Sequence, residues 1–197
     1  MPRRYSMAKR GRATVRTRRR IELALIELLA ARPYSAISAN DIATRAAISV
    51  RTIQRQYASK DDILAACVSF QARALADDLA ARPPASSLRE ALRDFVEALF
   101  AFYKANSEQA WAVYSRSQDV PVLNEVRNGA IGSRESLIDQ LYERWPDGWS
   151  TNRRKARAAI LGLTSFGTWS ALTDAGRFTP EDAAEFTLGA LERTLLK

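Results

Sequence analysis

The stretch SANDIATRAAISVRTIQRQYASK, residues 38–60, decides the fold that we predict for this chain. Ser38 is a good N-cap residue, and Asp41, three positions later, completes a loose capping box. A short helix is therefore expected to start at Ser38 and to run to about Ala46. The next two residues then form a tight turn.

A second short helix is expected directly after that turn. Ser49 is a preferred N-cap residue, and the helix runs from Val50 to Tyr57. Its buried face holds Ile53 and Tyr57, because residues four apart lie on one side of a helix. Residues 14–31 show apolar side chains at helical spacing and predict a longer helix before both. A short helix, a tight turn and a second short helix, braced by a preceding helix, have the geometry of a helix-turn-helix motif.

The outer face of the second short helix carries side chains that can read DNA bases. The major groove of B-DNA admits one α-helix; arginine pairs there with guanine, glutamine with adenine, and threonine or valine methyl groups touch the thymine methyl. The side chains on this face are Val50, Arg51, Thr52, Gln54, Arg55 and Gln56. The arginines can instead be solvated surface residues, and the glutamines can face a phosphate, a base or solvent.

Charge is spread unevenly along the chain, whose net charge is +8. Residues 1–60 contain fourteen Lys and Arg and three acids, whereas residues 61–197 contain sixteen Lys and Arg and nineteen acids. Nine of the cations lie among the first twenty residues, which contain no acid. Such a module favours a polyanion as its partner, either nucleic acid or, less readily, an anionic membrane surface. A solvated basic tail without a specific partner is the other explanation.

The rest of the sequence also shows helical patterns, so we predict an all-α fold with three parts. Residues 1–13 are polar and basic and are expected to form a disordered basic arm. Residues 14–60 form the helix-turn-helix domain. Residues 61–197 form a C-terminal helical bundle, in which Ser59 caps the first helix and a Pro- and Ser-rich linker follows it.

Several helix boundaries in the second domain can be predicted from capping and breaking residues. A helical segment is expected from Pro121 to Trp145, with a break at Gly129 and Gly132. A long helix is expected over residues 151–175. The last helix starts at Thr179, where a threonine, a proline and two acids follow one another.

Composition argues against several classes of protein. The chain has no histidine and one cysteine, Cys67, which is expected to be a buried small apolar residue. Histidine-dependent triads, His-ligated zinc sites and intrachain disulfides are therefore excluded. No apolar run approaches the length of a membrane span. We expect no enzyme, no cofactor, no metal and no membrane partner.

Residues 42–64 carry a resemblance to a known protein family. The chain resembles the signature of TetR-type (TetR/AcrR) transcriptional regulators, roughly I-A-x-x-A-G-V-S-x-x-T-L-Y-x-x-F-x-S-K-x-x-L. The spacing of the Ile-Ala pair, the Ser, the Thr, the aromatic residue and the Ser-Lys pair is kept. Ala47 departs from it by replacing the turn glycine, which predicts a strained or differently formed turn. Gln54 departs by replacing a tyrosine that touches the DNA backbone in the family.

The resemblance implies an all-helical homodimer whose N-terminal domains bind a palindromic operator in double-stranded DNA. Its C-terminal domain would bind a small effector that releases the DNA. Lys60 resembles the family's phosphate-binding lysine, and Tyr57 is expected to serve both the core and a backbone contact. With Ser38 and Ser49, these residues complete the predicted DNA-binding set. The N-terminal cations either read the minor groove or neighbouring phosphates, or belong to an arm without a partner.

Aromatic residues of the second domain could line an apolar effector pocket. Aromatic residues at helical spacing are more often plain core, and this alternative stays open. The predicted pocket residues are Phe95, Leu99, Phe102, Tyr103, Trp111, Tyr114, Trp145, Phe166 and Trp169.

Small residues gather on the helix predicted over 151–175. Small side chains let a partner helix approach closely, and with the last helix this region resembles the family's two-helix dimer face. Close packing within one subunit is the alternative. The predicted dimer residues are Gly162, Gly167, Ser170, Ala171, Phe186 and Ala190.

The leading hypothesis is a DNA-binding transcriptional regulator of the bacterial cytoplasm, a repressor that a small apolar effector releases from its operator. The alternative is a DNA-binding protein of the same fold that has no small effector and is controlled by a protein partner. A helical enzyme is the weakest hypothesis, because the sequence has no Gly-rich phosphate loop and no metal-ligand cluster.

Overall fold

The computed structural model describes residues 3–116 and 120–197, with side chains from Ala13 onward apart from a few in α4, α6 and α7. This part of the chain is helical and contains no β-strand, which confirms the predicted all-α fold. The elements are α1 (Arg3–Ala31), η1 (Tyr34–Ala36), α2 (Ala39–Arg45), α3 (Val50–Gln54), α4 (Lys60–Ala81), α5 (Leu88–Ala105), α6 (Ser107–Arg116), α7 (Pro121–Arg144), η2 (Pro146–Gly148), α8 (Arg153–Leu163), α9 (Phe166–Ser170), η3 (Ala171–Ala175) and α10 (Pro180–Leu195).

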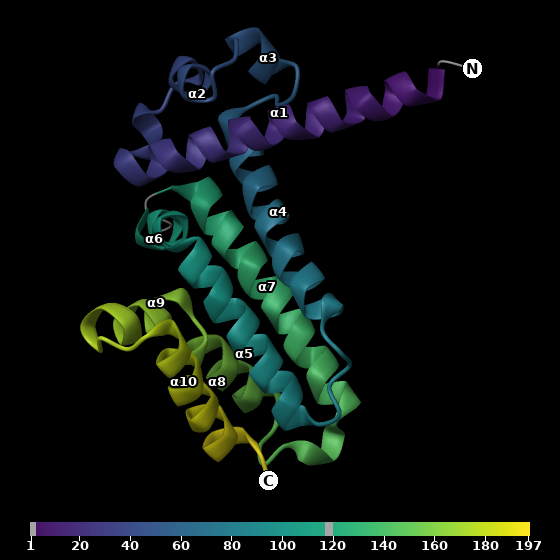
Figure 1. Cartoon of the computed structure of the whole chain (residues 1–197). Helices are drawn as coiled ribbons and strands as arrows, with labels where there is room; N and C mark the ends of the chain where they lie inside the picture. Colours follow the sequence, from purple (N-terminus) through teal and green to yellow (C-terminus); the bar gives the residue numbers. More distant parts are fainter. Residues whose placement is uncertain (1–2, 117–119) are drawn as a thin grey trace.

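The helices build two hydrophobic cores, one at each end of α4. In Figure 1, α1 lies across one end of the molecule, with α2 and α3 on its outer side and the longer helices on the other. The first core joins α1, α2, α3 and the first turns of α4, and it also takes in Leu123 of α7. The second core joins α5, α7, α8, α9 and α10. Ile63 and Leu64 of α4 are fully buried in the first core, and each such residue is worth about 1.5–3 kcal/mol.

Helix α1 begins earlier than the sequence predicts. A disordered arm was expected over residues 1–13, yet the helix starts at Arg3; residues 1 and 2 lie outside the described residues. Residues 3–13 are mostly Arg, Lys, Ala and Met, which are strong helix formers, and Gly11 alone among them strongly disfavours a helix. The helix can therefore continue outward from its buried half.

The predicted helix starts at Ser38, Ser49, Ser59 and Thr179 are confirmed. Each side chain accepts a hydrogen bond from a backbone N–H in the first turn of its helix. Three of the starts are complete capping boxes, in which an aspartate also accepts from the N-cap backbone. Capping residues act through neighbours in sequence, which is why local spacing predicts them.

Helix α7 has no break, and the break predicted at Gly129 and Gly132 was wrong. The helix runs without interruption from Pro121 to Arg144. A glycine inside a helix costs only about 1 kcal/mol. Burial of Leu123 and Ile138, both fully buried, offsets that cost.

The prediction of one long helix over residues 151–175 was also wrong, because this region is divided into α8, α9 and the π-helix η3. The hydroxyl of Thr164 donates to the carbonyl of Ile160 at 2.6 Å. Ser165 then acts as an N-cap and accepts from the backbone N–H of Thr168 at 3.1 Å. The Thr-Ser pair therefore ends one helix and starts the next.

Among the residues that the structure describes, no helix is both long enough and apolar enough to cross a membrane.

Candidate nucleic-acid interface

Helix α3 is the element that the sequence predicts to read DNA, and it is shorter than expected. It runs from Val50 to Gln54 rather than to Tyr57. The next residues remain hydrogen-bonded: the backbone N–H groups of Gln56 and Tyr57 both donate to the carbonyl of Ile53, at 2.8 and 2.9 Å. The predicted helix therefore closes with a tighter final turn.

The buried side of this segment is as predicted, but the predicted outer side is exposed only in part, and Val50 packs against the first core. Ile53 is 4% exposed and Tyr57 is 6% exposed, so both anchor the segment in the first core. The exposed side chains are Arg51, Gln54 and Arg55, and the half-buried ones are Val50, Thr52 and Gln56. A short helix with one buried anchor and exposed Arg and Gln side chains can enter the major groove.

The serines of the predicted DNA-binding set serve the helix starts. The Ser49 hydroxyl accepts from the backbone N–H of Thr52 at 3.2 Å and also contacts the Thr52 hydroxyl at 2.9 Å. The hydroxyl and backbone N–H of Ser38 donate to Asp41 at 2.6 and 2.8 Å. Hydrogen bonds from Ser38, together with the guanidinium of Arg32 at 3.0 Å, lower the pKa of Asp41 to about 2.

Tyr57 lies in the core, and its hydroxyl is engaged there. The hydroxyl donates to the buried carboxylate of Glu22 at 2.6 Å. Arg18 of α1 donates to the same hydroxyl at 3.3 Å and lies over the ring, 4.8 Å from its centroid. Burial, and then the bond to Glu22, raise the pKa of Tyr57 to about 12. The expected core role is confirmed, and no group of Tyr57 is left facing outward for a phosphate.

Lys60 lies at the start of α4, and its amine is bound inside the domain. The Nζ donates to the carbonyls of Tyr34 at 2.6 Å and Ile37 at 2.8 Å, and it lies 4.0 Å from the centroid of the Tyr34 ring. Desolvation lowers the pKa of Lys60. Beside it, the Tyr34 hydroxyl donates to Asp61. The side chain expected to bind phosphate therefore ties the η1 segment to α4.

Arg20 of α1 holds the turn between α2 and α3, a structural role that the sequence analysis did not predict. Its guanidinium donates to the carbonyls of Ala46 and Ala47, the residues that form the turn between α2 and α3. Ala47 has a φ of 50°, in the left-handed region that favours glycine. The strain expected from the missing turn glycine is thus present. No local spacing links Arg20 to a turn 26 residues later, so no pattern in the sequence predicts this contact.

The predicted effector residues divide into a ring cluster, buried core and an outlier. Phe166 of α9 contacts four of the predicted rings, with centroids 5.3–6.5 Å apart. The members of this ring cluster are Tyr103, Trp111, Tyr114, Phe166 and Trp169. Phe102 adjoins the cluster at Tyr103. Phe95 and Leu99 are buried in the second core. Trp145 is elsewhere, under the guanidinium of Arg144.

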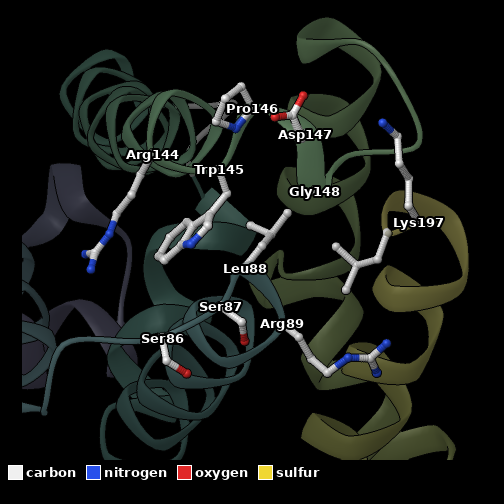
Figure 2. Close-up of a pocket in the computed structure, with 11 residues that line it drawn as sticks. Ser86, Ser87, Leu88, Arg89, Arg144, Trp145, Pro146, Asp147, Gly148 and Lys197 are labelled. Atoms are coloured by element: carbon white, nitrogen blue, oxygen red, sulfur yellow. The ribbon is translucent and has the colours of Figure 1, made fainter.

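Two hollows open on the surface of the second domain, away from the ring cluster. One, of about 490 Å³, lies between the start of α5, η2 and the last residues of the chain (Figure 2). Of the predicted pocket residues, it is lined by Trp145 alone. The other, of about 600 Å³, lies between α5 and α10 and is lined in part by Phe186.

The predicted dimer residues also divide. Phe186 is 51% exposed, and Gly162 and Ala171 are exposed as well. Ser170 is buried and donates to Asp174 at 2.7 Å, and Ala190 is half-buried. A Cβ on Gly167 would lie 2.7 Å from the Tyr114 hydroxyl of the same chain. The absence of a side chain at Gly167 is therefore explained by packing within one subunit.

Comparisons with known proteins agree with this geometry. Residues 23–67 match the family model described as bacterial regulatory proteins, tetR family. No curated protein matches the chain. Among solved structures, the chain is similar to the fatty acid degradation regulator FadR of Bacillus halodurans, at 18% identity over 88% of this chain and 93% of that chain, with a TM-score of 0.74.

Two further solved structures share the fold. NalD, the secondary repressor of the MexAB-OprM multidrug efflux pump in Pseudomonas aeruginosa, is 20% identical over 94% of this chain and 98% of that chain, with a TM-score of 0.73. FadR of Bacillus subtilis, solved with stearoyl-CoA, is 16% identical over 87% and 96%, with a TM-score of 0.66.

The match to the tetR family model, together with the capped helix-turn-helix, identifies residues 23–67 as the DNA-binding domain of a transcriptional regulator. Its DNA-binding domain, from the second half of α1 to the first turns of α4, is of the TetR type, which confirms the resemblance seen in residues 42–64.

Proposed function

We propose that this regulator is a repressor that binds a palindromic operator as a homodimer and is released by a small apolar effector. The observation that carries the proposal is α3, which starts at a Ser49 cap, is anchored by Ile53 and presents Arg51, Gln54 and Arg55 to solvent. The exposed face of α3 is accounted for if one such helix per chain reads DNA bases. This reading would take place in the bacterial cytoplasm.

Recognition would rest on hydrogen bonds from these three side chains. An arginine can donate two hydrogen bonds to guanine, and a glutamine can pair with adenine in the same way. Gln54 stands where the family signature has a tyrosine, and its amide can donate to a phosphate instead. The caps on α2 and α3 and the Arg20 contact to the turn hold this face in place.

Symmetric reading requires two chains. Each chain has one such helix, and two reading helices reach successive major grooves only about 34–36 Å apart or at multiples of that spacing. A two-fold dimer provides this spacing and matches a palindrome. The exposed residues Gly162, Ala171 and Phe186 are the part of the predicted dimer face that remains open to a partner chain.

Effector control would act through α4. This helix starts beside the helix-turn-helix at Lys60 and ends at the second domain at Ala81, so a tilt of α4 would change the spacing of the two α3 helices. A hundredfold release needs about 2.7 kcal/mol of coupling, which burial of one aromatic ring can supply. The ring cluster is the proposed contact for an apolar ligand. NalD is described as a repressor, and the Bacillus subtilis FadR structure contains stearoyl-CoA, which supports the proposal by analogy of fold.

Control by a protein partner without a small effector is the second candidate. One observation favours it: the rings of the cluster pack on one another, and the two hollows described above lie elsewhere. In that case Trp111 and Tyr114, 53% and 46% exposed, would contact the partner protein directly.

Selection of bound duplexes from a random pool tests the DNA-binding proposal. We expect an enriched sequence with two-fold symmetry and half-sites about one or two helical turns apart. An enriched site without symmetry would contradict binding as a symmetric dimer, and no enrichment would contradict specific binding. A thermal-shift screen of apolar compounds, followed by operator release for each hit, separates effector control from control by a protein partner.

A further inference from the structure

We propose that the N-terminal part of α1, residues 3–20 and called the basic extension below, is a second DNA-binding element. It would contact backbone phosphates of the duplex that flanks the half-site read by α3. This inference rests on the proposed DNA binding by α3 and adds a contact outside the helix-turn-helix.

The charge of the basic extension is the first observation. The first twenty residues contain nine Lys and Arg and no acid. Arg12 and Arg16 lie four residues apart, and like charges at that spacing repel on a helix. A row of phosphates removes this repulsion and releases the counterions condensed on the DNA. Duplex DNA is therefore a partner that stabilises this helix.

The shape of α1 is the second observation. In Figure 1 its N-terminal half projects past α3, with no other element beside it. Val15 is 68% exposed and Arg16 is exposed, so packing within the chain does not account for the projection. The thirteen residue steps between Arg3 and Arg16 correspond to about 20 Å of helix, which spans about six base pairs of duplex.

Contacts between α1 and the reading segment are the third observation. Arg18 donates to the hydroxyl of Tyr57, which follows α3. Arg20 donates to the carbonyls of Ala46 and Ala47, which precede α3. The inner end of the basic extension is thus held from both sides of α3. When α3 enters the major groove, the extension is carried to the same duplex in a fixed direction.

An anionic membrane surface fits the basic extension less well. Helices that lie on a membrane bury a broad apolar face with Trp, Phe or Leu. Residues 1–20 contain none of these residues, and their large apolar side chains are Met1, Tyr5, Met7 and Val15. Phosphates on DNA need no apolar face, because the attraction is to charge alone.

The test measures how salt weakens DNA binding. The full-length protein and its Lys9→Gln/Arg12→Gln/Arg16→Gln variant are titrated against the selected operator, either with ten flanking base pairs on each side or trimmed to its half-sites. We expect the wild type to prefer the flanked duplex about tenfold or more, and we expect the variant to lose that preference. The slope of log affinity against log salt should fall by about two to three units, since each phosphate contact contributes about 0.9.

The matched control removes three cations at the other end of the molecule. Arg154, Lys155 and Lys197 are exposed, and the variant with Gln at all three should keep the wild-type slope and the wild-type preference. Glutamine forms helices about as well as Lys and Arg, so circular dichroism should show unchanged helix content in both variants.

Each outcome decides the matter. An unchanged slope and preference in the Lys9, Arg12 and Arg16 variant would overturn the inference while leaving binding by α3 intact. If the Lys9, Arg12 and Arg16 variant loses binding to phosphatidylglycerol vesicles and its DNA binding is unchanged, the extension binds a membrane and the inference is overturned as well. Failure of the wild type to bind any duplex would contradict the proposed function itself.

Discussion

Arg51 and Arg55 are four residues apart on one exposed face, and neither forms an ion pair with any residue that the structure describes. If each reads a base, Arg51→Ala or Arg55→Ala should weaken operator binding by about 1–3 kcal/mol and relax specificity at one position of each half-site. Arg73→Ala removes an exposed arginine from α4 and serves as the control. Operator affinity unchanged in both α3 variants would rule out base reading by these side chains.

Lys60 either holds the η1 segment to α4 or binds a DNA phosphate, and one variant distinguishes these two roles. Its amine is held by the carbonyls of Tyr34 and Ile37, and a hydrogen bond from a charged group is worth about 1.5–3 kcal/mol. We therefore expect Lys60→Ala to lower the free energy of unfolding by about that amount and to leave the salt slope of DNA binding unchanged. A slope reduced by about one unit, with unchanged stability, would instead show the phosphate contact that the sequence predicts.

Asp41 makes the stability of the helix-turn-helix depend on pH. Its pKa is lowered from the ordinary value of 3.8 to about 2 in the folded chain, chiefly by hydrogen bonds from Ser38. A group with a depressed folded pKa stabilises the protein above its unfolded pKa, and this stabilisation is lost as the pH falls through the folded value. Asp41→Asn should therefore lower the unfolding temperature at neutral pH. The difference from wild type should shrink as the pH falls from about 4 to about 2, and a constant difference would show that the carboxylate charge is not involved.

Helix α7 contains two glycines that lower its stability and have open space where a side chain would lie. Gly129 and Gly132 lie inside this helix, and a Cβ at either position would meet nothing within 4 Å. Because alanine is favoured over glycine in a helix interior by about 1 kcal/mol, Gly129→Ala and Gly132→Ala should each raise the free energy of unfolding by about that amount. Gly167→Ala is the contrasting variant, since its Cβ would lie 2.7 Å from the Tyr114 hydroxyl, and it should destabilise the chain. Urea unfolding measures all three; destabilisation by either α7 variant would contradict the assigned environment.

The helices show which features of sequence carry structural information. Helix starts were predictable, because Ser38, Ser49 and Thr179 bond to backbone groups three residues away. The interruption at Thr164 and the continuity at Gly129 were not, because propensity is weak and tertiary packing decides both. The helix-turn-helix was predictable as a whole for the same local reason.

The roles of the site residues were harder to predict than their positions. The inward side of the reading segment followed from the four-residue spacing of Ile53 and Tyr57. The engagement of Lys60 and of Arg20 did not, since their partners lie 23 to 27 residues away and no periodicity connects them. Long-range hydrogen bonds depend on the fold that surrounds them.

At the scale of the whole molecule, composition alone could not sort the aromatic residues. A phenylalanine in the core and one in a pocket have the same spacing on a helix, and what differs is the packing opposite them. Phe95 is fully packed in the second core, whereas Trp111 and Tyr114 have about half of their surface exposed. The sequence therefore predicted a set of aromatic residues, and the structure separates its members by exposure.

Assembly of two chains is the property on which palindrome reading depends, and Phe186 and Ala171 test it. Both are exposed, so a charged substitution should leave the folded chain intact. In a two-fold interface the same residue is contributed by both chains, and each new charge is therefore buried twice. Phe186→Glu and Ala171→Glu should convert a dimer, with twice the 22.0 kDa mass of the chain, into a monomer and abolish operator binding. Trp111→Glu makes a comparable change at 53% exposure outside the predicted dimer face and should remain dimeric. Sedimentation at micromolar concentration gives the mass, and a monomeric wild type, or variants that remain dimers, would exclude this face as the interface.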